Sequence, residues 1–285
     1  MNDVPGRPAK AHIPAPRRSL LRSRGVAVLV AVLSTVLVFG VAGWVVVHSP
    51  GWHEAQVRFF NADKFAATLP KIFAGFIVNL GIFLVAQVLV LMFALVLAVM
   101  RSLKDPVFFP FRLFAIVYID LFRGLPSILI IYVLGLGIPA LQIPGVTRDP
   151  YVWGIVALVL VWSAYVAEVY RSGIDSVHPS QDAAARSLGL SGFQAFRFVV
   201  LPQAVRRVIP PLLNDGIGLM KDTALISFLG PIEAFRRAQI FAGATFHFTP
   251  YLVSAMLFLV LTIPLARLVD WLVARDRKRY LAGAR

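Results

Sequence analysis

The chain has 285 residues, of which 59% belong to the hydrophobic set AVILMFWYC and only 15% are charged. Soluble domains average about 45–50% apolar and about 25% charged residues, so this composition excludes an ordinary water-soluble enzyme. There are 28 Lys and Arg against 14 Asp and Glu, for a net charge of +14, and no cysteine, which excludes disulfides and thiolate chemistry.

Apolar runs predict six membrane spans. Residues 1–24 contain four prolines and six cations and are expected to form a basic tail. The run 25–47 has no charge and exceeds the apolar core of a secretory signal, about 7–15 residues, so it is predicted to be an uncleaved first span. Residues 48–67 are mixed in character and are expected outside the membrane. The other five spans are predicted at about 72–100, 113–141, 151–169, 208–229 and 251–272. Residues 273–285 are predicted to form a second basic tail.

The predicted span 113–141 contains polar and helix-breaking residues. They are Asp120, Arg123, Gly124 and Pro126. A long, kinked or broken helix is therefore expected there.

The basic excess follows the topology. Six spans place both termini on the same side of the membrane. If that side is the cytoplasm, 19 Lys and Arg lie in inner segments, six in outer segments and three within spans. Inner loops of membrane proteins carry such an excess, so the charge sets orientation and does not indicate a nucleic-acid partner.

One cytoplasmic loop, residues 170–205, has the pattern of two short helices. Pro179 and Ser180 are expected to start the first, and Gly189 to end it in a left-handed turn. Ser191 with Gln194 forms a capping-box pattern. The second helix is predicted over about 192–200 and is expected to end at Pro202. Its apolar side chains, expected to bury against the body of the protein, are Phe193, Phe196 and Val200.

This loop resembles the EAA loop of ABC-importer permeases. The pattern is Ala183-Ala184-Ala185, three residues, Gly189, nine residues, Val199, one residue, Leu201-Pro202. Ala183 departs from the family's usual glutamate, although Asp182 precedes it. The resemblance implies that residues 178–202 are a coupling loop that docks on a separate ATPase. The residues that it assigns to this role are Asp182, Ala183, Ala184, Gly189, Leu190, Ser191 and Pro202.

Three further segments, 118–126, 167–173 and 219–227, resemble the polar amino acid branch of the same family. The resemblance spans about residues 68–272. It implies an all-α polytopic membrane protein with the type I ABC-importer permease fold, built from five core helices plus an extra N-terminal helix. It also implies a bacterial inner-membrane location and a translocation path for amino acids, opened by alternating access.

The expected partners are ABC ATPase subunits, an extracytoplasmic amino-acid-binding protein and a second permease chain, identical or not. No cofactor is expected on this chain, because ATP and Mg²⁺ are used by the ATPase.

Charged residues within spans are candidates for the path, because charge at membrane depth normally faces protein or water. Asp120 and Arg123 stand three apart and can pair, either as a structural pair or on the path. Lys221 and Asp222, followed by Thr223, could meet the carboxylate and ammonium of an amino acid, or could pair with another helix or chain. Glu168 and Arg171 are expected to anchor the loop that follows them.

Other functions are less consistent with the sequence. The chain has no Gly-Lys dipeptide and hence no phosphate-binding P-loop, so it is not expected to be an ATPase. A membrane-embedded enzyme is not expected either, because the chain has no cysteine, no cluster of histidines and no recognisable pair of inward carboxylates. An ion-coupled secondary transporter of small polar solutes is the alternative, but paired broken helices are not evident. The five histidines are scattered, and no metal site or catalytic residue is expected.

Overall fold

The computed structural model describes residues 24–103 and 105–283, and within them it contains helices but no strand. The chain divides into two compact units, Met1–Gln56 and Val57–Arg285. The predicted basic tail 1–24 lies, apart from Arg24, outside the described residues.

The first unit contains α1 (Arg24–Val47). Its apolar stretch Gly25–Val47 has a hydropathy of 2.6, and none of it is buried. The predicted first span is therefore confirmed as a helix of sufficient length and apolarity. Helix α2 (Trp52–Phe59) begins in this unit and ends in the second.

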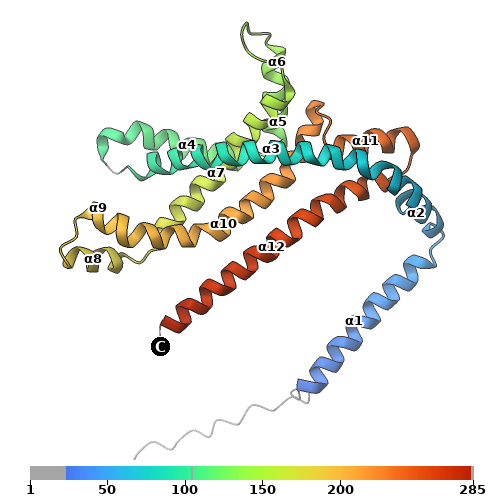
Figure 1. Ribbon diagram of the computed structural model, residues 1–285, viewed down its shortest axis with the longest axis horizontal. Helices are drawn as coiled ribbons and strands as arrows, with labels where there is room; N and C mark the ends of the chain where they lie inside the picture. The colour runs from blue at the N-terminus through green and yellow to red at the C-terminus, as the bar shows by residue number, and fades with distance from the viewer. Residues whose placement is uncertain (1–23, 104, 284–285) are drawn as a thin grey trace, which may run out of the picture. The chain divides into compact units, whose positions relative to one another are not determined.

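The second unit is organised around α3 (Ala62–Ser102), a helix of 41 residues. Asn61 caps it by accepting a hydrogen bond from the Lys64 N–H at 2.9 Å, so the helix begins earlier than expected, inside the segment 48–67. Helix α3 packs against α4 (Phe109–Gly124), α7 (Pro150–Asp175), α11 (Ala234–Thr245) and α12 (Thr249–Gly283) (Figure 1).

The predicted break in the third span is confirmed. A 3-10 turn, η2 (Pro106–Phe108), precedes α4, which ends at Gly124. The chain then bends by 104° before α5 (Ser127–Tyr132), the π-helical turn η3 (Val133–Gly137) and α6 (Ile138–Ala140). Pro126 explains the bend, because a residue before proline is driven out of the helical region, and Leu125 has ψ 140°.

The fifth predicted span is only partly α-helical. Helix α10 (Leu201–Asp222) continues as a 3-10 helix, η5 (Thr223–Leu229), which ends at Gly230 with φ +111°. Among the described residues, four helical stretches are long and apolar enough to cross a membrane, or five if the bent pair is one span. The charges of α10 keep it out of this set, although it packs against α7 and α12 inside the core.

The loop between α7 and α10 carries the short helices α8 (Pro179–Ser187) and α9 (Gly192–Ala195) and the π-helical turn η4 (Phe196–Val200). These elements lie together at one end of the second unit, and α11 lies at the other (Figure 1). The predicted C-terminal tail 273–285 continues helix α12 as far as Gly283.

Candidate functional site

The loop 178–202 has the local structure that its sequence predicts. Helix α8 begins at Pro179, and the His178 side chain caps it by accepting a hydrogen bond from the Ser180 N–H at 3.2 Å. Gly189 follows this helix with φ +92°. Hydrogen bonds from the Leu190 N–H to the Ala185 carbonyl (3.2 Å) and from the Gly189 N–H to the Arg186 carbonyl (3.0 Å) complete a Schellman turn.

The second helix starts as expected but does not end as expected. The Ser191 hydroxyl accepts a hydrogen bond from the Gln194 N–H, and the Gln194 side chain accepts one from the Ser191 N–H, which confirms the capping box. The expectation that Pro202 ends this helix is wrong. The π-helical turn η4 precedes Pro202, and the Leu201 N–H donates a hydrogen bond to the Phe196 carbonyl five residues earlier. Because of this wider turn, the helix tolerates a proline without an N–H and continues as α10.

The surface of the loop is more apolar than expected. Leu188 is 85% exposed and Phe193 is 72% exposed. Ala183 and Ala184 are exposed beside them, whereas Asp182 and Leu190 are half-buried. The expectation that Phe193 buries against the body is therefore wrong. A four-residue α9 held by its capping box directs this side chain outward.

The base of the loop is tied to three long helices. Glu168 on α7 pairs with Arg171 at 2.9 Å, as predicted, and also with Arg101 at the end of α3. Arg171 pairs in turn with Asp175 at 2.7 Å. On the other side, Arg207 of α10 donates a hydrogen bond to the Ser176 hydroxyl at 3.1 Å.

Close packing reinforces these ties. A Cβ placed on Gly173 of α7 would lie 2.0 Å from a methyl of Val208 on α10. The C-terminal ends of α3 and α7 and the N-terminal part of α10 are thus held together next to the loop. Glu168 serves as the structural anchor that the sequence indicated.

The break between α4 and α5 brings Arg123 to an unexpected partner. Asp120 is exposed and forms no ion pair with Arg123 in the described structure, so the expected pair is absent. The Arg123 guanidinium lies instead 5.6 Å from the ring centre of Tyr165 on α7.

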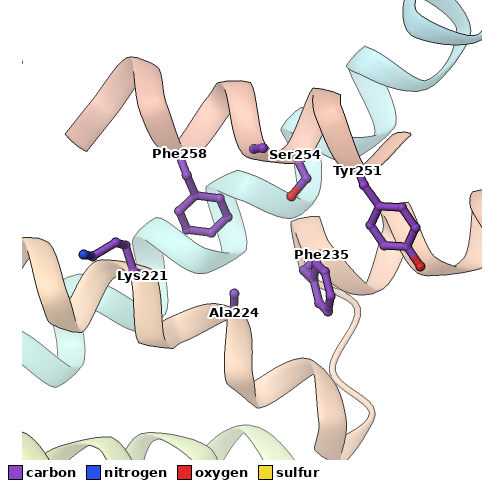
Figure 2. A pocket seen from close by; sticks show the side chains of 7 residues that line it. Lys221, Ala224, Phe235, Tyr251, Ser254 and Phe258 are labelled. Atoms are coloured by element: carbon purple, nitrogen blue, oxygen red, sulfur yellow. The ribbon is translucent and has the colours of Figure 1, made fainter. Parts of the chain in front are cut away.

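Lys221 and Asp222 lie on different sides of the end of α10. Lys221 is exposed and lines a pocket with Phe235, Tyr251 and Phe258, and its ammonium points away from Phe235 and Tyr251 (Figure 2). The Asp222 carboxylate instead accepts a hydrogen bond from the Trp162 indole N–H at 3.2 Å. The structure therefore does not bring these two charges into one cavity.

Thr223 is fully buried within a polar cluster. Its hydroxyl accepts a hydrogen bond at 3.0 Å from the side-chain amide of Asn79 on α3 and donates one to the Met220 carbonyl at 2.7 Å. The side-chain oxygen of Asn79 accepts a hydrogen bond from the Ala234 N–H at 3.1 Å. Thr223 thus connects α3, η5 and α11, and it has no exposed surface to offer to a path.

Glu233 completes this cluster as the N-cap of α11. Its carboxylate accepts hydrogen bonds from the N–H groups of Phe235 (2.9 Å) and Arg236 (2.7 Å). Burial raises the pKa of the Glu233 carboxyl, and these backbone hydrogen bonds act in the opposite direction. The cluster fixes α11 against α3.

Sequence reasoning missed Asp215, Trp162 and Tyr165. Asp215 lies seven residues before Asp222, which places both carboxylates on nearly the same face of a helix, and this spacing was the available signal. The indole of Trp162 and the ring of Tyr165 lie 5.5 Å apart on α7, facing that side of α10.

Among the described residues no three histidine or acidic side chains are grouped to hold a metal ion.

Comparisons with known proteins find components of transport systems. The family model of the binding-protein-dependent transport system inner membrane component matches residues 106–278. The probable glutamine ABC transporter permease protein GlnM of Bacillus subtilis is 35% identical, over 69% of this chain and 91% of its own. The probable amino-acid permease protein YxeN of the same organism is 32% identical, over 72% of this chain and 90% of its own.

A solved structure is also similar. It is described as the crystal structure of an amino acid ABC transporter with histidines. It superposes with a TM-score of 0.69 at 30% identity, covering 75% of this chain and 98% of the other.

Proposed function

We propose that this chain is the permease of an ATP-driven amino acid importer. The premise is that the chain belongs to the family of inner-membrane components of binding-protein-dependent transport systems. As a member of this family, with several apolar helices, it is a multi-pass membrane protein. The names of its relatives support amino acids as the substrate class. Family membership does not favour the alternative of an ion-coupled secondary transporter.

The observation that carries the proposal is the exposed surface of the loop 178–202. Two large apolar side chains, Leu188 and Phe193, stand 85% and 72% exposed on helices that a Schellman turn and a capping box hold in place. Apolar residues presented in this way, beside the small Ala183 and Ala184, suit a protein partner more than solvent. The proposed partner is an ATPase subunit, which would use ATP and Mg²⁺.

The connections of the loop suggest how force would pass into the membrane. Movement of α8 would reach α7 through the short chain at Val177 and His178 and reach α10 through η4. The Glu168–Arg101 pair would carry the same movement to α3. Because these helices are tied at one end, they would move as a unit during alternating access.

The rest of the assembly follows from the family. A second permease chain would complete the path, and an extracytoplasmic binding protein would deliver the substrate. The proposed location is the bacterial inner membrane with both termini in the cytoplasm, and α1 would be an additional N-terminal span.

The direct test is retention of the ATPase during purification in detergent. Leu188→Glu combined with Phe193→Glu should abolish co-purification, because two charges would enter an apolar contact. Val107→Glu is the matched control, since Val107 is 77% exposed but lies outside the loop. Equal ATPase recovery with the double variant and the control would refute docking through this surface.

A further inference from the structure

We propose that the groove between α3, α10 and α12 binds an anionic phospholipid, with an acyl chain in the groove and the phosphate group at Arg206 and Arg275. Such a lipid would be neither the transported substrate nor a subunit of the transporter, so the site goes beyond the proposed function.

The groove is a cavity of about 390 Å³ with an almost wholly apolar lining. Leu91 of α3, Leu213 of α10 and Leu268 of α12 contribute to its walls, and Gln87 is the one polar side chain among the residues that line it. At the rim, Ile209 is 42% and Leu268 is 44% exposed. An apolar opening of this kind at membrane depth accepts either a lipid tail or another helix, and the charges around it distinguish the two.

The groove lies toward the end of the unit that carries the loop 178–202. Helices α3 and α12 start side by side, because the Asn61 N–H donates a hydrogen bond to the Thr249 hydroxyl at 3.3 Å. Helix α3 ends at the loop, where Arg101 pairs with Glu168, and α10 begins there. The first half of α10 and the second half of α12 therefore form the groove, in the leaflet on the loop side of the membrane.

One arginine on each of two walls stands between the groove and the membrane surface. Arg206 precedes Leu213 by seven residues, and Arg275 follows Leu268 by seven residues. Seven residues turn a helix to within about 20° of the same face and advance it by about 10.5 Å. Both arginines thus lie on the groove-lining faces of their helices, displaced toward the loop side, which is where the headgroup of a lipid would be.

The surroundings of these arginines suit a phosphate group. The Arg275 guanidinium lies 5.2 Å from the ring centre of Trp271, which is 54% exposed, and exposed tryptophans of membrane helices favour the level of the lipid headgroups. Arg206 is exposed, whereas the neighbouring Arg207 is bonded to Ser176. Arginine binds phosphate oxygens through two parallel N–H donors.

Acidic side chains on the two helices face away from the groove. Asp215 and Asp270 are each two residues from a lining leucine, Leu213 or Leu268, and two residues turn a helix by about 200°. Asp270 is in addition paired with Arg267 at 3.1 Å. The groove thus presents cations at its loop-side end and no carboxylate among its lining residues, which favours an anionic ligand.

The same charges favour a lipid over a second copy of this chain. The segments on the loop side of the predicted spans contain 19 of the 28 Lys and Arg, so a second copy would bring further cations to this end of the groove. An anionic lipid brings the opposite charge together with the apolar tail that the groove fits. Basic pockets between membrane helices on the cytoplasmic side are known to bind anionic lipid headgroups, and the proposed orientation puts the loop on that side.

The test is native mass spectrometry of the full-length chain, with its co-purifying subunits, after lipid has been removed in detergent. Phosphatidylglycerol and phosphatidylcholine with the same acyl chains are titrated separately, and inorganic phosphate is added as a competitor. Each basic residue near a membrane surface strengthens binding of an anionic lipid about fivefold, so wild type should prefer phosphatidylglycerol by about 10- to 30-fold. Inorganic phosphate should not displace it, because phosphate has no acyl chain.

Two variants test the two ends of the site separately. Arg206→Gln combined with Arg275→Gln should reduce the preference for phosphatidylglycerol to within about threefold. Leu268→Trp should weaken binding of both lipids about tenfold, since the indole fills space that the acyl chain would occupy.

Each variant has a matched control on the same helix. Arg267→Gln removes a cation of α12 that is 77% exposed and already paired, and it should keep the wild-type preference. Ile263→Trp adds the same ring as Leu268→Trp, but Ile263 is 52% exposed and five residues from Leu268, about 140° around the helix. It should bind both lipids as wild type does.

Four outcomes would overturn the inference. Equal affinity for the two lipids in wild type, or an unchanged preference in the double arginine variant, would show that the arginines do not bind the headgroup. Displacement of the lipid by inorganic phosphate would indicate a site for a free anion. Separation of the permease pair by Leu268→Trp, with lipid affinity unchanged, would show that a second chain covers the groove.

Discussion

Gly189 offers the most direct test of the loop geometry. Its φ of +92° lies in the left-handed region, and a Cβ built on it would meet nothing within 4 Å. Replacement by alanine therefore adds backbone strain without a steric clash. That strain is about 1–2 kcal/mol for an L-residue.

The loop can relieve this strain if the Schellman turn opens. An open turn would move Leu188 and Phe193 away from the positions that they have in the intact turn. The apparent affinity for the ATPase then falls with the fraction of intact turn. A strain of 1–2 kcal/mol corresponds to a factor of about 5–30. Gly189→Asn should weaken docking less than Gly189→Ala, because asparagine tolerates left-handed backbone better.

The assay is titration of purified ATPase onto the permease in nanodiscs, with Gly192→Ala as the control. Gly192 is also free of neighbours within 4 Å but has ordinary helical backbone. This control should dock as wild type, since alanine favours the helix. Equal affinities for Gly189→Ala and Gly192→Ala would show that the turn has no part in docking.

Two further predictions concern stability. A Cβ at Gly75 would lie 2.7 Å from the backbone nitrogen of Ala234, so Gly75→Ala should lower stability by about 1–3 kcal/mol, whereas Gly81→Ala, with nothing within 4 Å, should not. Thermal unfolding in detergent measures both, and equal midpoints would contradict the close packing of α3 and α11. Glu168→Gln removes the carboxylate partner of Arg101 and one of the two carboxylate partners of Arg171, so it should lower stability by about 1.5–3 kcal/mol in the same assay. The exposed Asp270→Asn should lower stability by less than about 1 kcal/mol. A smaller loss for Glu168→Gln than for Asp270→Asn would refute the anchoring role.

Local signals in the sequence predicted the loop well. The start at Pro179, the turn at Gly189 and the capping box at Ser191 each depend on a few neighbouring residues, and each is confirmed. The break near Pro126 is confirmed for the same reason. The continuation of the helix through Pro202 was not predictable, because it depends on a π-helical turn that the sequence does not signal.

Side-chain partners were predicted less well. Asp120 and Arg123 have the spacing of a helical pair and both lie within α4, but the Arg123 guanidinium lies over the ring of Tyr165 on α7. Glu168 and Arg171 do pair on α7, where Arg171 also pairs with Asp175. The same three-residue spacing thus gave opposite outcomes.

Composition and spacing alone determined that this chain is a helical membrane protein with a structured loop between its fourth and fifth predicted spans. Apolar length, basic asymmetry and capping patterns are properties of short stretches, so they can be read without a fold. Only the tertiary structure decided which charges meet, that Lys221 and Asp222 face different sides, and that Asp222 bonds to Trp162 of α7. Those facts depend on how α4, α7 and α10 are placed against one another, and contacts between residues far apart in the chain set that placement.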